Sequence, residues 1–262
     1  MRAKKSLGQN FLNAPFVIQK MLDAAEVKAG DFVIEIGPGK GALTEALLHR
    51  GAKVCCYELD QRMVDYLSEK YQPAIAAGSL VIVRQDILEV DVTKELPQGP
   101  YKVIANIPYY ITNAIIRLFL SSNHQPTDMC LLVQKEVAQR IARDIKESIL
   151  SLSVKVYATA SYVIKVPARY FSPKPKVDSA VVNMKDISRS HFSEDITEEQ
   201  FFSVVKQGFA HKRKQLASNL AELFFDKTYW KETLQKRGYA ATVRAEDVHL
   251  NDWIFFAGLI NT

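Results

Sequence analysis

Four consecutive residues near the middle of the chain, Asn106-Ile107-Pro108-Tyr109, have types and a spacing suited to holding an amine for reaction. They follow an apolar run, Val103-Ile104-Ala105, that predicts a buried strand ending where a loop begins. Open α/β sheets bind ligands at that edge. The Asn106 carboxamide and the Pro108 carbonyl offer two acceptors for the hydrogens of an NH2 group, and the Tyr109 ring offers a stacking surface. The alternative is a strand stopped by proline, with Asn106 serving only a turn.

Three more predicted strands end in residues suited to an adenosine site. A glycine turn follows the first strand, so the backbone can approach a ligand and the next helix presents its free N–H groups. Glu58, after the second strand, can accept hydrogen bonds from both hydroxyls of a ribose. Asp86, after the third strand, is placed to meet an adenine edge. The strands 31–36, 52–57 and 80–84 thus supply Gly37, Glu58 and Asp86 in chain order, before Asn106.

The glycine turn by itself does not choose a cofactor. Gly37, Gly39 and Ala42 satisfy the dinucleotide-binding fingerprint, and Glu58 lies near the spacing expected of its ribose-binding acid. A nicotinamide enzyme is therefore an alternative for this segment. The segment 106–109 argues against it, because hydride transfer has no use for a pair of acceptors around an amine.

Six motifs follow one another along nearly the whole chain: KSLGQNFL at 5–12, GPGKG at 37–41, NIPY at 106–109, VQKEVA at 133–138, FSPKPKVDS at 171–179 and KRKQL at 212–216. With these motifs the chain resembles the ribosomal RNA adenine dimethyltransferases of the small-subunit type. The resemblance implies S-adenosylmethionine as methyl donor and the N6 amines of two neighbouring adenines in small-subunit RNA as acceptors, within an immature small subunit. It also implies a donor site made of Asn10, Leu12, Gly37, Gly39, Glu58, Asp86 and Asn106.

One stretch departs from the pattern of that family. Where the family usually has a loop containing proline and glycine, residues 143–151 contain neither. The segment could therefore extend the preceding helix instead of forming a turn. The loop lies near the substrate side in the family, so the departure bears on target choice or efficiency and not on donor binding.

The implied chemistry needs little from the protein beyond placement. The methyl group of a sulfonium is already electrophilic, so holding the amine in line with the methyl and the sulfur is the main task. Asn106 and Pro108 would accept the two N6 hydrogens, and Tyr109 would stack on the base. The amine loses its proton as or after it gains the methyl, so no strong general base is required. Phe171, beside a proline-rich loop, is either a second stacking face for the substrate or a core residue.

Positive charge is concentrated in three runs, although the net charge is only +5. Residues 1–20 contain four Lys and Arg residues and no acid, and residues 148–177 contain five and no acid. The third run is Lys212-Arg213-Lys214. One such run can be a solvated face, but three favour a polyanion with phosphates spaced along a surface. RNA is favoured over duplex DNA, because a target base must leave its stack and RNA loops release it more cheaply.

The composition is that of an ordinary globular protein, with 48% hydrophobic and 24% charged residues. No apolar run approaches the ~18 residues that span a bilayer, and the basic N-terminus lacks the apolar segment of a secretion signal. We therefore expect a cytoplasmic monomer with no membrane partner. Cys55, Cys56 and Cys130 lie in predicted strands, which indicates buried free thiols. Neither they nor the five scattered histidines have metal-ligand spacing, so no metal site is predicted.

Helical and strand-like segments alternate up to about Gln134, which predicts a Rossmann-like doubly wound sheet with helices on both faces. The clearest helices are 14–27, 61–70 and 112–121. Two β-rich runs, 162–166 and 179–184, are expected to complete the sheet by antiparallel pairing. We expect residues 1–185 to form a methyltransferase domain and residues 186–262 a small all-helical RNA-substrate domain of four or five helices. Core candidates in the second domain are Phe201, Phe202, Val205, Phe209, Leu216, Leu220, Leu223 and Phe224.

Three functions stay open from the sequence. The first is the small-subunit dimethyltransferase. The second is an adenine methyltransferase of large-subunit RNA that confers antibiotic resistance, which shares the motifs at 9–12 and 106–109. The residues 212–216, 219–220 and 244–247 resemble the first family and not the second. The third is a ribosome-assembly or transcription factor that keeps the fold without turnover, and the intact set of strand-end residues argues against it.

Overall fold

The computed structural model describes residue 4, residues 7–223 and residues 225–260. The chain divides into two compact units. The first consists of residues 1–142 and 158–187, and the second of residues 143–157 and 188–262. The sequence placed a single boundary after residue 185. The structure differs in that the segment 143–157 belongs with the C-terminal helices.

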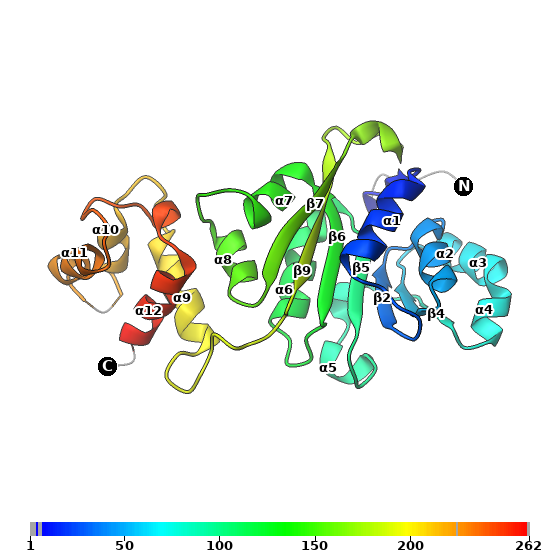
Figure 1. Cartoon of the computed structure of the whole chain (residues 1–262), viewed down its shortest axis with the longest axis horizontal. Helices are drawn as coiled ribbons and strands as arrows, with labels where there is room; N and C mark the ends of the chain where they lie inside the picture. Colours follow the sequence, from blue (N-terminus) through cyan, green and yellow to red (C-terminus); the bar gives the residue numbers. More distant parts are fainter. Residues whose placement is uncertain (1–3, 5–6, 224, 261–262) are drawn as a thin grey trace. The chain divides into compact units, whose positions relative to one another are not determined.

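A mixed seven-stranded sheet forms the centre of the first unit (Figure 1), and it confirms the predicted fold class. Its five parallel strands lie in the order β4 (Leu80–Val83), β3 (Lys53–Tyr57), β2 (Phe32–Ile36), β5 (Lys102–Asn106) and β6 (Asp128–Gln134). Next to β6 come β9 (Ser179–Lys185) and then β7 (Thr159–Val166), both with antiparallel pairing. The antiparallel completion of the sheet is therefore confirmed.

The order of the strands reverses between β2 and β5. From β2 the chain continues outward through β3 and β4, and it then returns to place β5 on the other side of β2. At such a reversal the connections leave in opposite directions, so a crevice opens outside the carboxyl ends of the two strands. The interior of the sheet is apolar, as expected of parallel strands covered on both faces.

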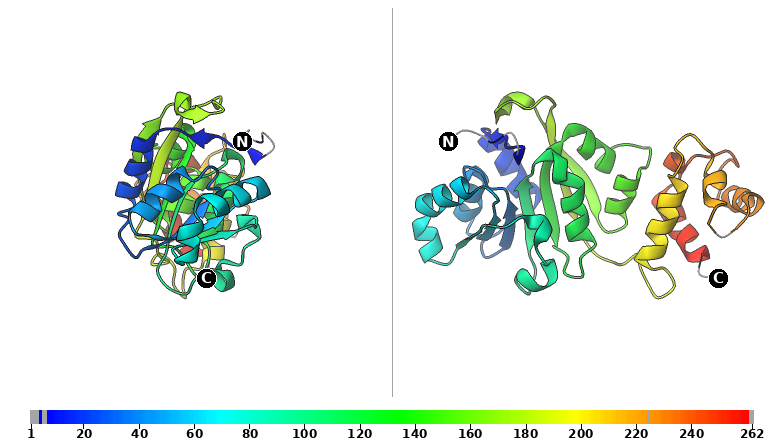
Figure 2. Two further views of the ribbon diagram at one scale, coloured as in Figure 1. Left: turned by 90° about the vertical axis from the view of Figure 1, so that its right-hand side faces the viewer. Right: turned by 180° about the vertical axis from the view of Figure 1, so that it is seen from behind.

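Helices cover both faces of this sheet. Figure 1 shows α1 in front of the strands, and the view from behind in Figure 2 shows α6 in front of them. The helices of the first unit are α1 (Pro15–Ala24), α2 (Ala42–His49), α3 (Gln61–Lys70), α4 (Gln72–Ala76), α5 (Val92–Glu95), α6 (Thr112–Leu120) and α7 (Lys135–Ala142). The three clearest predicted helices are confirmed, whereas the short α4 and α5 were not expected. A small second sheet pairs β1 (Phe11–Leu12) with β8 (Phe171–Ser172).

The segment 143–151 does not extend α7. That helix ends at Ala142, and a new helix, α8 (Ile149–Lys155), begins after Ser148. The side chain of Ser148 accepts a hydrogen bond from the Ser151 N–H, and the Ser151 side chain accepts one from the Ser148 N–H. This reciprocal cap starts a new helix at Ile149, which residues 143–148 separate from α7. The possibility of a continuous helix was therefore wrong, because residues 143–148 are not helical and Ser148 caps the start of a separate helix.

The second unit is helical, with α9 (Glu198–Gly208), α10 (Leu216–Leu220), α11 (Lys227–Lys236) and α12 (Leu250–Leu259) following α8. Helices α9 and α12 lie side by side, in yellow and red in Figure 2. Of the core candidates, Phe201, Val205, Leu216 and Leu220 are buried, and Phe202, Phe209 and Leu223 are half-buried. Phe224 lies outside the described residues. The two tryptophans, Trp230 and Trp253, complete this core.

The three cysteines are buried and free, as predicted. Burial raises the pKa of the Cys55 thiol to about 11, so the thiol stays protonated at neutral pH. In the part of the chain that the structure describes, no helix is long and apolar enough to cross a membrane. The same residues contain no group of three or more His, Cys, Asp or Glu side chains arranged to hold a metal ion.

Candidate functional site

A cavity of about 320 Å³ lies at the carboxyl ends of the central strands of the first unit. Its volume is in the range of small-molecule sites. It is lined by the residues that follow β2, β3, β4 and β5 and by the N-terminal segment 7–13. The structure brings together around it nine residues that the sequence predicted for the donor site and the amine: Asn10, Leu12, Gly37, Gly39, Glu58, Asp86, Asn106, Pro108 and Tyr109.

The glycine turn after β2 forms one wall of the cavity. Gly39 has a φ of +56°, and a Cβ at this position would lie 2.9 Å from the ring of Phe11. The N-terminal segment can therefore pack closely on the turn only because residue 39 has no side chain. Gly37 also has a positive φ, and an added Cβ there would meet nothing within 4 Å. The space beside the Gly37 backbone is thus open on the side where a Cβ would stand.

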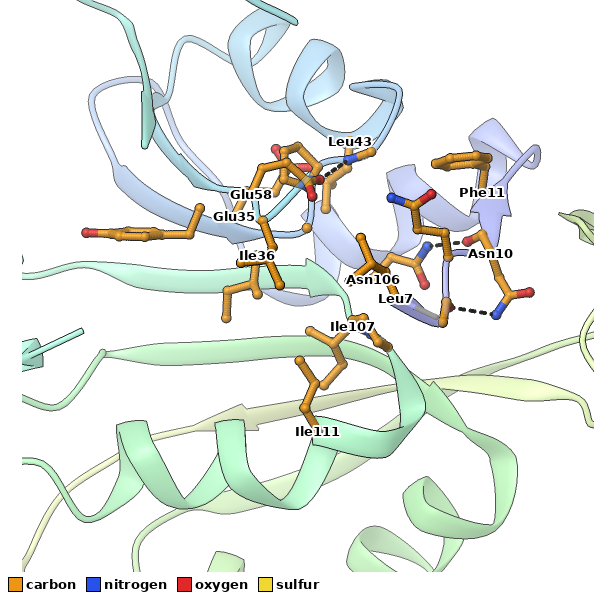
Figure 3. A pocket seen from close by; sticks show the side chains of 18 of the residues that line it. Leu7, Asn10, Phe11, Glu35, Ile36, Leu43, Glu58, Asn106, Ile107 and Ile111 are labelled. Carbon is orange, nitrogen blue, oxygen red and sulfur yellow. Dashed lines mark hydrogen bonds between the residues drawn. The ribbon is translucent and has the colours of Figure 1, made fainter. Parts of the chain in front are cut away.

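Glu58 lies at the end of β3 and is 6% exposed. One carboxylate oxygen accepts the Asp60 N–H at 2.9 Å, and the other accepts the Gly39 N–H at 3.3 Å. Burial raises the pKa of Glu58, and the two N–H groups oppose this shift. Since each carboxylate oxygen can accept a second hydrogen bond, the side chain keeps its capacity for two hydroxyl groups. Figure 3 shows the Glu58 side chain at the edge of the glycine turn.

Glu35 also lines the cavity, although the sequence pattern did not single it out. It lies within β2, is 1% exposed, and accepts a hydrogen bond from the Thr44 hydroxyl at 2.7 Å. Burial is the main cause that raises the pKa of Glu35 from 4.5 to about 7, and the nearby Glu58 raises it further. The available signal was a carboxylate inside an otherwise apolar strand, Phe32–Ile36.

The charges around the cavity are mostly negative. Among its described lining residues are three carboxylates, Glu35, Glu58 and Asp86, and one cation, Lys40. One oxygen of Asp86 accepts the Leu88 N–H at 3.0 Å, which fixes the side chain at the end of β4. A wall of this kind favours a cationic ligand and disfavours a pyrophosphate. The nicotinamide alternative is therefore less compatible with the site than a sulfonium donor.

The Asn106 side chain is fixed by the N-terminal segment. Its Nδ2 donates to the backbone oxygen of Asn10 at 3.1 Å, as the dashed line in Figure 3 shows. Only the amide nitrogen can donate to a carbonyl, so this contact decides which way the carboxamide is turned. Oδ1 is left as an acceptor, and it makes no hydrogen bond within the described residues. The sequence did not indicate this second task of Asn106.

Pro108 and Tyr109 are also held in place. The Pro108 carbonyl accepts the Ile111 N–H at 3.3 Å, and its second lone pair remains for another donor. The Tyr109 hydroxyl is hydrogen-bonded to that of Ser179 at 2.6 Å, and burial raises the pKa of Tyr109. Both residues belong to the start of a short 3-10 helix, η3 (Tyr109–Ile111). The ring is therefore positioned before any substrate arrives.

The N-terminal segment is tied to the loop that carries Glu58. Asp60 accepts hydrogen bonds from Lys4 Nζ at 3.2 Å and Gln9 Nε2 at 3.1 Å. Its strongest partner is Arg62, and this guanidinium holds the pKa of Asp60 far below its usual range. The charged Asp60 thus keeps the segment against the cavity. Lys5 and Ser6, which belong to the first sequence motif, lie outside the described residues.

Phe171 does not belong to the cavity wall. It is 4% exposed, pairs with Leu12 between β8 and β1, and packs in the hydrophobic core. This burial is that of a core residue, which is the second of the two interpretations of Phe171. The other predicted RNA contacts, Lys212, Arg213 and Lys214, lie in the second unit and are exposed.

The doubly wound sheet, the antiparallel β9–β7 pair and a ligand cavity at the strand ends define the protein as an α/β methyltransferase. The model of the ribosomal RNA adenine dimethylase family matches residues 1–256. The chain belongs to this family, which is one of rRNA-modifying methyltransferases. Membership implies S-adenosylmethionine as the methyl donor.

Curated relatives agree with this assignment over nearly their whole length. The chain is 40% identical over 256 residues to the ribosomal RNA small subunit methyltransferase A of Dehalococcoides mccartyi, covering 97% of this chain and 87% of the relative. It is 37% identical over 254 residues to the enzyme of the same name from Fusobacterium nucleatum, covering 96% of this chain and 95% of the relative.

Two solved structures share the fold of almost the entire chain. A dimethyladenosine transferase from Plasmodium falciparum superposes with a TM-score of 0.78 at 25% identity, covering 96% of both chains. The 23S rRNA methyltransferase ErmE superposes with a TM-score of 0.76, also at 25% identity, covering 97% of this chain and 100% of the other. A dimethyladenosine transferase and a 23S rRNA methyltransferase therefore share this fold, so the fold alone does not identify the RNA that the chain modifies.

Proposed function

We propose that the protein transfers methyl groups from S-adenosylmethionine to the N6 amines of two adjacent adenines in small-subunit ribosomal RNA, during ribosome assembly. The observation that carries the proposal is the fixed Asn106 carboxamide, whose Nδ2 is occupied by Asn10 and whose Oδ1 is left to accept an amine hydrogen. The small-subunit target is supported by the full-length similarity to enzymes named for that substrate.

The cavity residues fit S-adenosylmethionine. Glu58 can accept both ribose hydroxyls, and Asp86 keeps one oxygen without a partner in the described residues for the adenine amine. The open backbone at Gly37 leaves room for the donor next to the glycine turn. The carboxylates of Glu58 and Asp86 favour the positive charge of the donor. When bound, the donor supplies an electrophilic methyl group.

The protein's own residues orient the amine. Asn106 Oδ1 and the Pro108 carbonyl accept the two N6 hydrogens, which turns the nitrogen lone pair toward the methyl group. The Tyr109 ring, held by Ser179, stacks on the adenine. After the first transfer only one N6 hydrogen remains, so the second methyl must be accepted with one of the two hydrogen bonds absent. Solvent can take the released proton, because the methylated nitrogen is strongly acidic before the proton leaves.

We propose that the second unit also binds the RNA substrate. Lys212, Arg213 and Lys214 lie in the turn between α9 and α10, and none of them forms an ion pair within the described residues. Cations without acidic partners are available for phosphates. A monomer that grips folded RNA at separate points would prefer an immature small subunit to naked RNA.

A methyl-transfer assay on three substrates tests the function. Purified protein and labelled donor are incubated with naked small-subunit RNA, immature small subunits and large-subunit RNA, and modified nucleotides are identified by mass spectrometry. We expect dimethyladenosine at two adjacent positions near the 3′ end of small-subunit RNA, with most label in immature subunits. Label confined to large-subunit RNA would assign the protein to the resistance enzymes. Tight donor binding without any label would indicate an assembly factor that has lost turnover.

A further inference from the structure

A second tyrosine ring lies at the rim of the cavity, directly after Tyr109. Tyr110 lines the cavity and is nevertheless 66% exposed. Tyr109 is half-buried and tied to Ser179 through its hydroxyl. Two consecutive residues of η3 therefore hold one ring within the protein and one ring in solvent, both at the mouth of the same pocket.

The Tyr110 ring rests against the backbone of the N-terminal segment. Gly8 has a φ of +62°, and a Cβ at this position would lie 3.2 Å from Cε1 and 3.4 Å from Cδ1 of Tyr110. Because Gly8 has no side chain, the ring is supported by backbone and remains uncovered on its solvent side. A ring that is held in place before binding loses little conformational freedom when a ligand stacks on it.

Packing within the chain does not explain why this ring is exposed. Phe16, which is 46% exposed, packs edge-to-face on Tyr170, and Phe255, which is 40% exposed, packs against Phe256. Tyr110 makes no contact with another ring or a cation within the described residues. Its position at the cavity mouth, and not its exposure alone, points to a partner that approaches the cavity from solvent.

We propose that Tyr110 is a stacking platform for the base next to the target adenine. The proposal rests on the proposed function: when the target base enters the cavity it leaves its stack, so its neighbour loses a stacking partner. Aromatic side chains commonly replace that partner in single-stranded RNA. With two adjacent target adenines, each is the neighbour of the other.

Methyl-transfer kinetics on immature small subunits test the platform. Tyr110→Ala is expected to lower kcat/KM for the subunit about 5- to 100-fold, mainly through KM, and to leave the dissociation constant of the donor unchanged. Tyr110→Phe keeps the ring and should restore wild-type kinetics. Phe16→Ala, which removes an exposed ring outside the cavity wall, should have no effect. Equal kinetics for wild type and Tyr110→Ala would overturn the proposal.

A substrate that lacks the neighbouring base separates stacking from an indirect effect on the protein. In subunits reconstituted with an abasic site beside the target adenine, the kcat/KM of the wild type should fall by the same factor that Tyr110→Ala causes on intact subunits. On this substrate, Tyr110→Ala should cause no further fall. If Tyr110→Ala is equally harmful on this substrate, the ring acts through the protein and the platform is wrong. If the wild-type protein transfers no methyl group to any small-subunit RNA, the proposed function fails and the platform fails with it.

Discussion

The donor cavity and the basic turn at Lys212, Arg213 and Lys214 are built on opposite principles. Around the cavity, the key side chains are already engaged: Glu58 accepts two backbone N–H groups, and Asn106 donates to Asn10. In the basic turn, all three side chains are exposed and form no ion pair within the described residues. The first region defines positions for individual atoms, whereas the second offers charge without defined geometry.

This difference implies different sensitivities. A preorganised site loses function steeply when one atom is removed, because the remaining groups cannot move to replace it. A cluster of solvated cations loses affinity gradually, and salt screens what remains. The cavity should therefore respond to single substitutions with little dependence on salt. The basic turn should respond to several substitutions together, with a strong dependence on salt.

The largest effect is expected from Asn106→Ala. Loss of the amine acceptor should lower the rate of methyl transfer about 100-fold or more, as for other preorganised polar groups. Donor affinity, measured by calorimetry, should change much less. Asn106→Asp keeps an acceptor but cannot donate to Asn10, so it reports the second task of the side chain. Equal losses in transfer and in donor affinity would mean that Asn106 serves the donor and not the amine.

Glu58→Ala should weaken donor binding about 10- to 100-fold, because two hydrogen bonds to the ribose are removed at ~1 kcal/mol or more each. Glu58→Gln keeps one carbonyl acceptor, so its donor affinity should lie between those of Glu58→Ala and the wild type. Circular dichroism must show that both variants are folded, since Glu58 also accepts the Gly39 and Asp60 N–H groups. Unchanged donor affinity in a folded Glu58→Ala protein would remove this residue from the site.

Neutralising Lys212, Arg213 and Lys214 together to glutamine should weaken RNA binding about tenfold near physiological salt and leave donor binding unchanged. Each phosphate that the variant no longer neutralises should lower the slope of log K against log salt by ~0.7 to 0.9. The matched control neutralises Lys206, Lys227 and Lys236, three exposed lysines of the same unit. Identical salt slopes for the two triple variants would show that the basic turn is an ordinary solvated surface.

The last prediction concerns stability and its dependence on pH. The folded-state pKa of Glu35 is raised from 4.5 to about 7, so its contribution to stability is fully present below pH 4.5 and is lost as pH rises through 7. Between pH 4.5 and 7, the free energy of unfolding of the wild type should fall by up to ~1.4 kcal/mol per pH unit relative to that of Glu35→Gln. Urea denaturation at pH 5 and pH 8 measures this difference.

Two controls isolate the titration of Glu35. Glu58, whose pKa is raised in the same direction, is present in both proteins, so it enters the difference only through its coupling to Glu35. Glu69→Gln removes an exposed carboxylate from α3 and is the matched control for the loss of one carboxylate at the surface. If the difference between wild type and Glu35→Gln is constant from pH 5 to pH 8, Glu35 does not titrate in this range.

Local sequence determined the elements and most of the cavity wall. Apolar runs of about five residues specified the parallel strands, and the polar or glycine residue after each run specified what stands at its carboxyl end. Because parallel strands end at one edge, Gly37, Glu58, Asp86 and Asn106 had to meet there once the doubly wound order was accepted. The alternation of segments predicts a parallel sheet, whereas the reversal of strand order between β2 and β5 is known only from the structure.

Only the tertiary structure decided the contacts between residues distant in the chain. The tie between Asn10 and Asn106 spans 96 residues, and the hydrogen bond between Tyr109 and Ser179 spans 70. No periodicity or local motif encodes such a pair, since the partners depend on how strands and loops pack. For the same reason Phe171 became a core residue, Tyr110 became an exposed ring, and segment 143–157 joined the helical unit. Sequence could name the groups that chemistry requires, whereas packing alone decided which of them are held, buried or left free.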